Sequence, residues 1–187
     1  MTSKAAKRVE LMGRVADRLL AVGVAQIALR DLAAELGTSD RMLLYYFKDK
    51  ADLVRSSLDV IASRLSRMLD TAAPRVRTKP GELLVTLLGL LRSEPLTPVM
   101  NVWADIVARG GRGEQPFREI AGQSVAGWLD WLDQRLDVES PADRRDSAAA
   151  ILTIVEGARQ LEAVAPGSTR DVGATLSRAF RNFREAD

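Results

Sequence analysis

Residues 29–50, LRDLAAELGTSDRMLLYYFKDK, contain the pattern that decides the fold of this chain. Apolar residues recur in it at intervals of three and four on both sides of Gly37, which is typical of two short helices joined by a tight turn. Ser39 stands where it can cap the second helix, and Ala33 is small enough to let the two helices cross closely. The apolar side chains that would seat both helices on a preceding helix are Leu32, Leu36, Leu43 and Phe47. The stretch therefore predicts a helix-turn-helix.

The second helix of such a motif enters the major groove of DNA with its N-terminal residues facing the base edges. Arg41 is the best candidate for reading a base, through a bidentate contact with guanine, while Asp40 can accept a hydrogen bond from a cytosine amino group. Tyrosine hydroxyls and lysine ammonium groups donate to phosphate. The predicted DNA-contacting residues are Lys4, Arg30, Thr38, Ser39, Asp40, Arg41, Met42, Leu44, Tyr45, Tyr46, Lys48 and Lys50.

The distribution of charge along the chain agrees with this placement. The 187 residues include 27 Lys and Arg against 25 Asp and Glu, a net charge of only +2. Residues 1–50 hold nine of the basic residues and six of the acidic ones, whereas the remainder is almost neutral. A basic N-terminal module attached to a neutral body is expected of a nucleic-acid-binding protein, although a solvated helix face accounts for part of the bias.

The rest of the chain also has the periodicity of helices. No segment alternates apolar and polar residues in the manner of a strand, and prolines stand where several apolar segments begin. The predicted fold is all-α, with an N-terminal three-helix DNA-binding domain and a C-terminal helical bundle. About nine helices are expected, near residues 4–22, 29–36, 40–47, 49–72, 80–92, 96–109, 115–136, 141–164 and 168–184.

Composition excludes several classes of function. The chain has no Cys and no His, so it offers no Cys- or His-ligated metal site, no Cys nucleophile and no Ser-His-Asp triad. A two-carboxylate glycosidase needs neither residue, but it normally uses a larger scaffold. We expect no enzyme activity, no metal and no cofactor. The longest apolar run, residues 83–91, is too short to cross a membrane, and the N-terminus lacks a secretory signal, so a cytoplasmic protein without a membrane partner is expected.

The segment GTSDRMLLYYFKDKADL, residues 37–53, resembles the recognition-helix region of the TetR family of transcriptional repressors. The residues that match the habits of the family are Gly37, Ser39, Leu43, Tyr46, Phe47, Lys48, Lys50 and Leu53. The resemblance implies a homodimer that binds a pseudo-palindromic operator on double-stranded DNA and is released by a small-molecule effector. It also implies a DNA-binding domain at residues 1–48 and an effector-binding and dimerisation domain at residues 49–187.

Four positions depart from the pattern of the family, and they fall on functional positions. Leu44 stands where a Tyr is common, and Asp40 and Arg41 replace the usual Lys and small residue after the capping Ser. Ala28 occupies a position where Ser or Thr often caps the second helix. These departures predict an operator unlike that of a member with the usual residues.

The C-terminal part of the chain carries the candidate effector site. Helical bundles build ligand sites from inward-facing side chains, and wide aromatic residues beside small ones leave room for a cavity. An apolar or aromatic effector is expected, because few charged residues face this interior. The predicted ligand-binding residues are Met100, Asn101, Trp103, Gln123, Trp128, Trp131, Thr153 and Glu156. The alternative is that Trp and Met at helical spacing simply form the core.

The last two predicted helices carry more apolar surface than one neighbour can cover. A two-fold four-helix interface between subunits would bury it, and a dimer also places two recognition helices about 34–36 Å apart, in successive major grooves. The predicted interface residues are Ala148, Leu152, Val155, Val172, Leu176, Phe180 and Phe183.

Two other classes of function remain open on the sequence. A helical protein-protein interaction or small-molecule-binding dimer with a degenerate DNA-binding motif predicts no salt-dependent binding to any duplex. A small-molecule carrier or enzyme predicts tight ligand binding or turnover and no operator.

Overall fold

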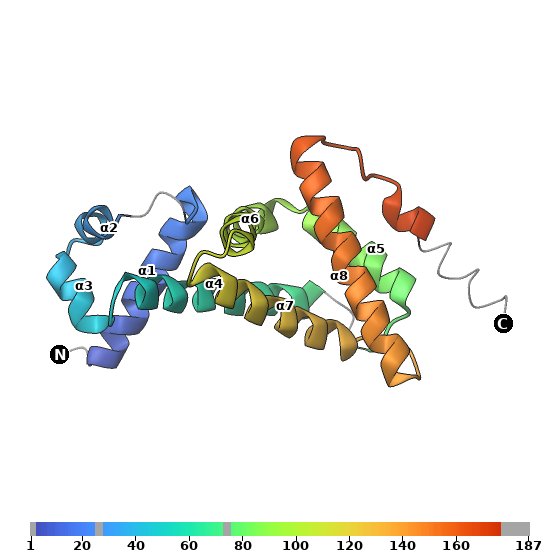
Figure 1. The fold of residues 1–187 in the computed structure, drawn as a ribbon, viewed down its shortest axis with the longest axis horizontal. Helices are drawn as coiled ribbons and strands as arrows, with labels where there is room; N and C mark the ends of the chain where they lie inside the picture. Colours follow the sequence, from blue (N-terminus) through green and yellow to red (C-terminus); the bar gives the residue numbers. More distant parts are fainter. Residues whose placement is uncertain (1–2, 25–27, 73–75, 177–187) are drawn as a thin grey trace. The chain divides into compact units, whose positions relative to one another are not determined.

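The computed structural model describes residues 3–24, 28–72 and 76–176, and within these ranges it confirms the all-α fold (Figure 1). No β-strand occurs there, and Thr78 and Leu136 form an isolated bridge. Residues 172–176 are helical, so the ninth helix begins later than the predicted residue 168, and residues 177–184 of the predicted range lie outside the described residues. The elements are α1 Lys4–Val22, α2 Leu29–Glu35, α3 Asp40–Tyr46, α4 Lys50–Ala72, α5 Pro80–Leu91, the 3₁₀ helix η1 Glu94–Leu96, α6 Thr97–Gly111, α7 Phe117–Asp133 and α8 Pro141–Val164.

Capping residues explain where several of these helices begin. The side chain of Ser3 accepts a hydrogen bond from the amide of Ala6 at 3.1 Å. The side chain of Ser140 does the same for the first turn of α8. Pro80 and Pro141 occupy the first positions of α5 and α8, where the missing amide hydrogen costs nothing. The helix starts that prolines predicted near residues 80 and 141 are therefore found.

The described residues form two compact units, and each is considered by itself. The first contains α1–α3, α4 as far as residue 67, α6, and α7 as far as residue 124. The second contains the last turn of α4, α5, η1, the remainder of α7, and α8. These are units of packing. The functional boundary after residue 48 stays a prediction.

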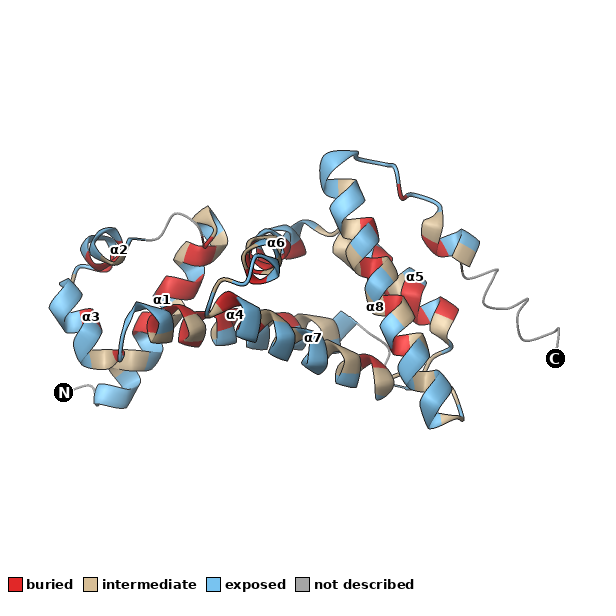
Figure 2. Cartoon of the chain, viewed as in Figure 1, coloured by how far each residue is buried: buried red, intermediate tan, exposed pale blue. Residues whose placement is uncertain are grey.

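The core of the first unit includes the residues that the helix-turn-helix pattern predicted. Helix α1 buries a stripe along one side, and α2, α3 and the start of α4 also bury apolar side chains (Figure 2). Leu32, Ala33, Leu36, Leu43 and Phe47 are all buried, as expected. The other buried side chains of α1 and the first turn of α4 are Leu11, Val15, Ala16, Leu19, Leu53 and Val54.

The core of the second unit is an apolar contact between α5 and α8. Helix α5 buries one face and leaves Val85 almost half exposed, so it is not enclosed on all sides by described residues. The buried cluster consists of Leu83, Leu84, Leu87, Leu88, Leu132, Leu136, Ala148, Ile151, Val155 and Ala158. At about 25 cal/mol per Å² of apolar surface removed from water, such a cluster provides most of the stabilisation of a small helical unit.

The apolar character of α5 does not extend over a membrane-spanning length. In the part of the chain that the structure describes, no single helix is long and apolar enough to cross a membrane. Helix α5 and the following stretch Glu94–Gly111 reach that length and composition only when they are taken together.

Candidate nucleic-acid interface

The turn between α2 and α3 is fixed by a pair of backbone hydrogen bonds. The amide of Thr38 donates to the carbonyl oxygen of Ala33 at 2.9 Å, and the amide of Gly37 donates to that of Ala34 at 3.1 Å. This is a Schellman motif, and it requires a positive φ at the residue after the helix. Gly37 has a φ of 67°, a conformation that costs glycine little. The chain therefore reverses here as the sequence predicted.

Helix α3 is only seven residues long, and such a helix is marginal in isolation. Its start is capped by the side chain of Ser39, which accepts from the amide of Met42 at 3.3 Å. Leu43 points into the core and is fully buried. The opposite face is exposed, with 42% of Met42, 47% of Leu44 and 57% of Tyr45 accessible to solvent. An exposed apolar face on a short helix is typical of a contact surface.

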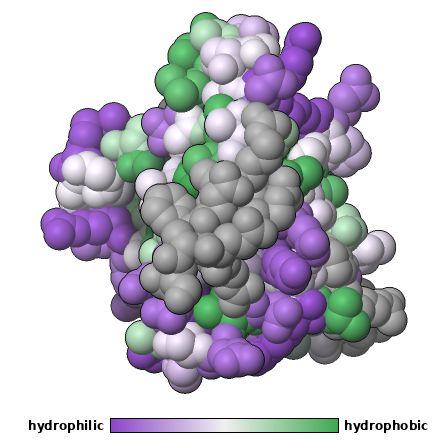
Figure 3. Space-filling model, turned by 90° about the vertical axis from the view of Figure 1, so that its right-hand side faces the viewer, coloured by the Kyte–Doolittle hydropathy of each residue, from purple (hydrophilic) through white to green (hydrophobic). Residues whose placement is uncertain are grey.

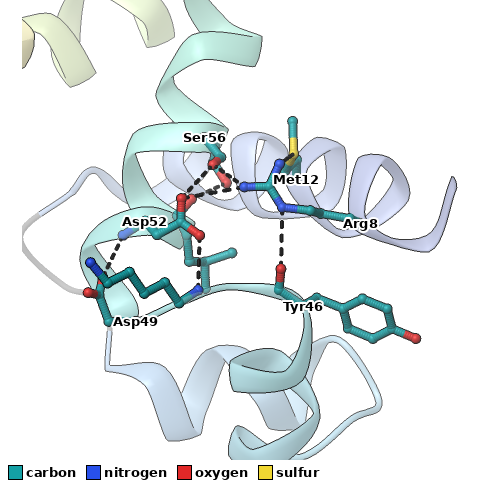
Figure 4. Close-up of polar contacts among 9 residues, drawn as sticks. Arg8, Met12, Tyr46, Asp49, Asp52 and Ser56 are labelled. Atoms are coloured by element: carbon teal, nitrogen blue, oxygen red, sulfur yellow. Dashed lines mark hydrogen bonds and ion pairs between the residues drawn. The ribbon is translucent and has the colours of Figure 1, made fainter. Parts of the chain in front are cut away.

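Arg8 of α1 holds the end of α3 and the start of α4 together (Figure 4). Its Nε donates to the carbonyl oxygen of Tyr46 at 3.3 Å, and its Nη2 donates to Ser56 Oγ at 2.9 Å. Nη2 also lies 3.4 Å from a carboxylate oxygen of Asp52. The guanidinium carbon lies 4.9 Å from the centre of the Phe47 ring. One side chain thus joins three helices of the motif.

The connection between α3 and α4 is a reciprocal cap. Asp49 Oδ1 accepts from the amide of Asp52 at 2.8 Å, and Asp52 Oδ2 accepts from the amide of Lys48 at 3.0 Å (Figure 4). The two carboxylates satisfy amides at the helix start that would otherwise lack partners, and negative charge is favourable at that end of a helix. The first turn of α4 is therefore fixed relative to the end of α3.

Arginines of α1 also hold the end of α2. Arg14 Nη1 donates to the carbonyl oxygen of Leu36 at 3.0 Å, and Arg18 Nε lies 2.7 Å from a carboxylate oxygen of Glu35. A cation at a helix C-terminus satisfies free carbonyl groups and interacts favourably with the helix dipole. Both short helices are thus attached to α1 by guanidinium groups.

All twelve predicted DNA-contacting residues lie in the first unit. Lys4 Nζ lies 4.1 Å above the ring of Tyr45, which meets the ring of Tyr46 edge to face at 5.1 Å between centroids. Asp40 and Arg41 are exposed in the first turn of α3. Of the remaining residues, Arg30 is exposed on α2, Thr38 is half-buried in the turn, and Lys48 and Lys50 are exposed at the start of α4.

Arg8 is the residue of this site that the sequence interpretation missed. Its position on α1 contained a usable signal, because it lies on the same helical stripe as Leu11, Val15 and Leu19, which are buried. A charged residue at such a position needs partners inside the fold. Ala28 precedes α2 without any side-chain cap, as its apolar side chain predicted.

The predicted effector residues of the first unit lie on α6 and α7. Met100 and Trp103 are buried on α6, whereas Asn101 and Gln123 are exposed. Gln123 Nε2 donates to Glu119 at 3.4 Å.

Several predicted effector residues of the second unit already interact with other residues of the chain. Trp131 Nε1 donates to Asp70 at 2.9 Å, and the guanidinium of Arg135 lies 3.9 Å from the centre of the Trp131 ring. Thr153 donates to a backbone carbonyl of its own helix. The remaining two residues are Trp128, which is half-buried, and Glu156, which pairs with Arg159 at 3.4 Å. The effector site stays a prediction.

The predicted dimer residues differ in how far the chain itself covers them. Ala148 and Val155 belong to the core of the second unit, so most of their apolar surface is already buried without a partner. Leu152, Val172 and Leu176 are half-buried. Phe180 and Phe183 lie outside the described residues.

Residues 14–56 match the family model for bacterial regulatory proteins of the tetR family. This segment of the chain is TetR-like. The match begins inside α1 and ends within the first two turns of α4, so it includes the turn, α3 and the cap of α4. No curated protein matches the sequence.

Solved structures share this TetR-like fold along nearly the whole chain. A transcriptional regulator from Rhodococcus sp. Rha1 has a TM-score of 0.72 at 18% identity, covering 96% of each chain. A TetR transcription regulator from Haloarcula marismortui ATCC 43049 has a TM-score of 0.66 at 20% identity, covering 96% of this chain and 97% of its own. The multidrug binding protein EbrR, complexed with imidazole, has a TM-score of 0.66 at 18% identity over 93% and 94% of the two chains. At these identities the likeness shows the fold alone.

Proposed function

We propose that this chain represses transcription by binding, as a homodimer, a pseudo-palindromic operator through α3, and that a small effector releases it. The observation that carries the proposal is the exposed face of α3, supported from behind by Arg8 and by the cap of α4. Side chains that meet DNA must be accessible, while the helix that presents them must be positioned accurately. Both conditions are met by α3.

Each exposed residue of α3 has a proposed partner on the duplex. Arg41 contacts the O6 and N7 atoms of a guanine, and Asp40 accepts from a cytosine amino group. Met42 and Leu44 contact thymine methyl groups. Phosphates are contacted by Tyr45 and by the lysines at the two ends of the motif, Lys4, Lys48 and Lys50.

The effector is proposed to act through α6 as well as α4. Helix α6 buries Met100 and Trp103, and two residues after Trp103 it carries Asp105. Asp105 Oδ2 accepts from the amide of Val24 at 3.1 Å, immediately after α1. A shift of α6 would therefore be transmitted to α1 directly. The crystallised EbrR complex with imidazole supports a small-molecule ligand for this fold.

Helix α4 provides the second proposed connection, because its first turn is capped against α3. Within the same unit Arg55 Nη2 lies 2.8 Å from Glu119 of α7, and this hydrogen bond lowers the pKa of the glutamate below its usual range. Through this ion pair, a movement of the start of α7 on effector binding would also move α4. An effector that favours one state by about 1–3 kcal/mol would change operator affinity about 5- to 150-fold.

Dimerisation is supported by apolar surface near the end of α8. Leu161 and Val164 are exposed although both are apolar. Figure 3, which faces the right-hand side of Figure 1, shows hydrophobic residues beside strongly hydrophilic ones at the top of the view. A two-fold partner would cover such residues.

The test is fluorescence anisotropy on labelled DNA from the region upstream of the gene, against a scrambled duplex, at several salt concentrations. We expect preferential binding with log affinity falling linearly in log salt. Arg41→Ala should relax the preference at one base pair by about 1–3 kcal/mol. Arg118→Ala, which removes an exposed arginine of α7, is the matched control and should bind as the unaltered protein does. Absence of binding to any duplex at low salt would favour the protein-protein interaction alternative.

A further inference from the structure

A cavity of about 460 Å³ lies beside the loop that follows α8, outside every residue assigned above. It is lined by Arg92, Glu162, Pro166, Gly167 and Arg170, all of which belong to the second unit. Two of the five lining residues are arginines, one is acidic, and Pro166 is apolar. The cavity thus joins the end of α5 to the end of α8.

Glu162 fixes the shape of the loop that forms one wall. Its carboxylate accepts from the amide of Gly167 at 2.6 Å and from the hydroxyl and amide of Thr169 at 2.6 and 3.3 Å. Thr169 is buried, with only 3% of its surface exposed. Gly167 has a φ of 85°, so a residue with a side chain would be strained there. The wall is therefore preorganised.

Arg92 is anchored on this wall from the end of α5. Its Nη2 donates to the carbonyl oxygen of Thr169 at 2.8 Å. A guanidinium has five N–H groups, so this bond leaves donors that can be directed to a ligand. Fixing the side chain in advance reduces the entropy lost when a ligand binds.

Arg170 supplies the second guanidinium. Its Nη2 lies 3.9 Å from the point where a Cβ on residue 167 would sit, so it is folded over the backbone of Gly167. The side chain is exposed, and within the described ranges neither Arg170 nor Arg92 has a carboxylate at ion-pair distance. Among the described residues, both guanidinium groups therefore keep N–H donors that can be directed to a ligand.

The balance of charge in the cavity favours an anion. Two guanidinium groups face one carboxylate, and that carboxylate is already occupied by three donors. The hydrogen bond from the Thr169 hydroxyl, followed by that from the Gly167 amide, lowers the pKa of Glu162, so the group stays ionised and keeps its donors at neutral pH. An additional anion would meet the arginines without needing the carboxylate to move.

We propose that this cavity binds a small ligand bearing an oxyanion, either a carboxylate or a phosphate. Guanidinium groups match the planar fork of a carboxylate and the tetrahedral oxygens of a phosphate, and charge-assisted bonds of this kind are among the strongest in proteins. None of the residues that line it belongs to α6 or to α3. It adds an anionic ligand to a protein whose proposed effector is apolar.

Isothermal titration of the full chain, without DNA, tests the proposal. The probes are inorganic phosphate and, separately, succinate, at constant ionic strength maintained with chloride. We expect one of them to bind saturably, with one site per chain, and the probe that binds identifies which oxyanion the cavity prefers. Arg170→Gln should weaken that binding by roughly tenfold or more, the effect of losing a charge-assisted hydrogen bond.

Arg145→Gln is the matched control, since Arg145 is an exposed arginine of α8 that does not line the cavity. It should leave the affinity unchanged. Arg92→Gln is a second variant, checked first for an unaltered thermal transition because Arg92 also supports Thr169. Absence of saturable binding of either probe at millimolar concentration would overturn the proposal. So would equal affinity in the unaltered protein and in Arg170→Gln.

Discussion

The motif formed by α1–α4 and the pair formed by α5 and α8 are stabilised by different kinds of contact. In the motif, guanidinium groups of α1 donate to backbone carbonyls at the ends of the short helices, as Arg8 does at Tyr46 and Arg14 does at Leu36. The α5–α8 pair relies on leucine, isoleucine and alanine side chains buried against each other. The polar bonds have geometric preferences, whereas apolar burial is roughly proportional to area and has no direction.

The difference follows from helix length. Helices α2 and α3 have seven residues each, so each offers few positions to a core, while α8 has 24. A short helix positioned only by apolar contacts could slide or tilt, and bonds to its terminal carbonyls remove that freedom. The polar bonds therefore fix the positions of α2 and α3 within the motif. The apolar contact between α5 and α8 contributes mainly to the free energy of unfolding.

Of the substitutions considered, removal of a core leucine should lower the free energy of unfolding the most. Leu84→Ala removes a fully buried side chain of α5, and we expect the free energy of unfolding to fall by about 2–5 kcal/mol. Val85→Ala, at the next and partly exposed position, should cost clearly less. Urea denaturation followed by circular dichroism measures both. Equal losses for the two variants would contradict the finding that α5 buries the face that carries Leu84 and leaves Val85 partly exposed.

Replacement of Gly23 should give the next largest loss of unfolding free energy, because a residue with a side chain is strained in the backbone conformation that ends α1. Gly23 has φ 77° and ψ 173°, a region nearly restricted to glycine, and an added Cβ would lie 2.7 Å from Asp105 Oδ2. Gly23→Ala should therefore cost about 1–3 kcal/mol of unfolding free energy. Gly122→Ala, at a helical glycine with open space around it, should instead stabilise by about 0.4–1 kcal/mol. Thermal unfolding of both variants checks the opposite signs.

Loss of Arg8 should affect stability less and DNA binding more. Arg8→Met keeps the apolar stem but removes the donors to Tyr46 and Ser56, which should cost about 1 kcal/mol because the site is partly exposed. We expect a lower operator affinity, because α3 loses an anchor. Lys7→Met is the control, since the ion pair that Lys7 forms among the described residues is with Glu10, one turn along the same helix. Operator affinity unchanged in Arg8→Met would show that α3 is positioned by its apolar contacts alone.

The smallest effect is a local dependence on pH in the loop after α8. The pKa of Glu162 is lowered in the folded protein, so its contribution is present above the unfolded pKa and is lost as pH falls through the folded one. Hydrogen exchange at the amides of Gly167 and Thr169 should therefore become faster, relative to the core of α5, on acidification below the usual glutamate pKa. In Glu162→Gln, the protection of these amides should not depend on pH. If protection in the unaltered protein were also independent of pH, the prediction would be wrong.

The features that were predictable from the sequence are those that depend on neighbours along the chain. The cap at Ser39 and the turn at Gly37 each need only residues within a few positions, and both are found as expected. The C-terminal end of α7 shows the limit. The apolar periodicity predicted a helix to residue 136, but α7 ends at Asp133 because the following backbone bonds to Thr78.

Contacts between distant residues were not predictable in the same way. Arg8 donates hydrogen bonds to residues 38 and 48 positions later in the sequence. Asp105 accepts one from Val24, which lies 81 positions earlier. Nothing in a local pattern specifies such pairs. The surface of α3 could be predicted because it depends on which face Leu43 and Phe47 bury, whereas the structure was needed to reveal what supports that surface.

The division of α3 into a buried and an exposed face has a consequence for how such a protein diversifies. Its anchors are Leu43, Phe47 and the backbone carbonyl of Tyr46, none of which depends on the identity of the exposed side chains. Mutations at Arg41, Met42 and Leu44 can therefore accumulate after gene duplication with little loss of folding. A descendant can acquire a new target sequence in single steps, each of which leaves a folded protein for selection to act on.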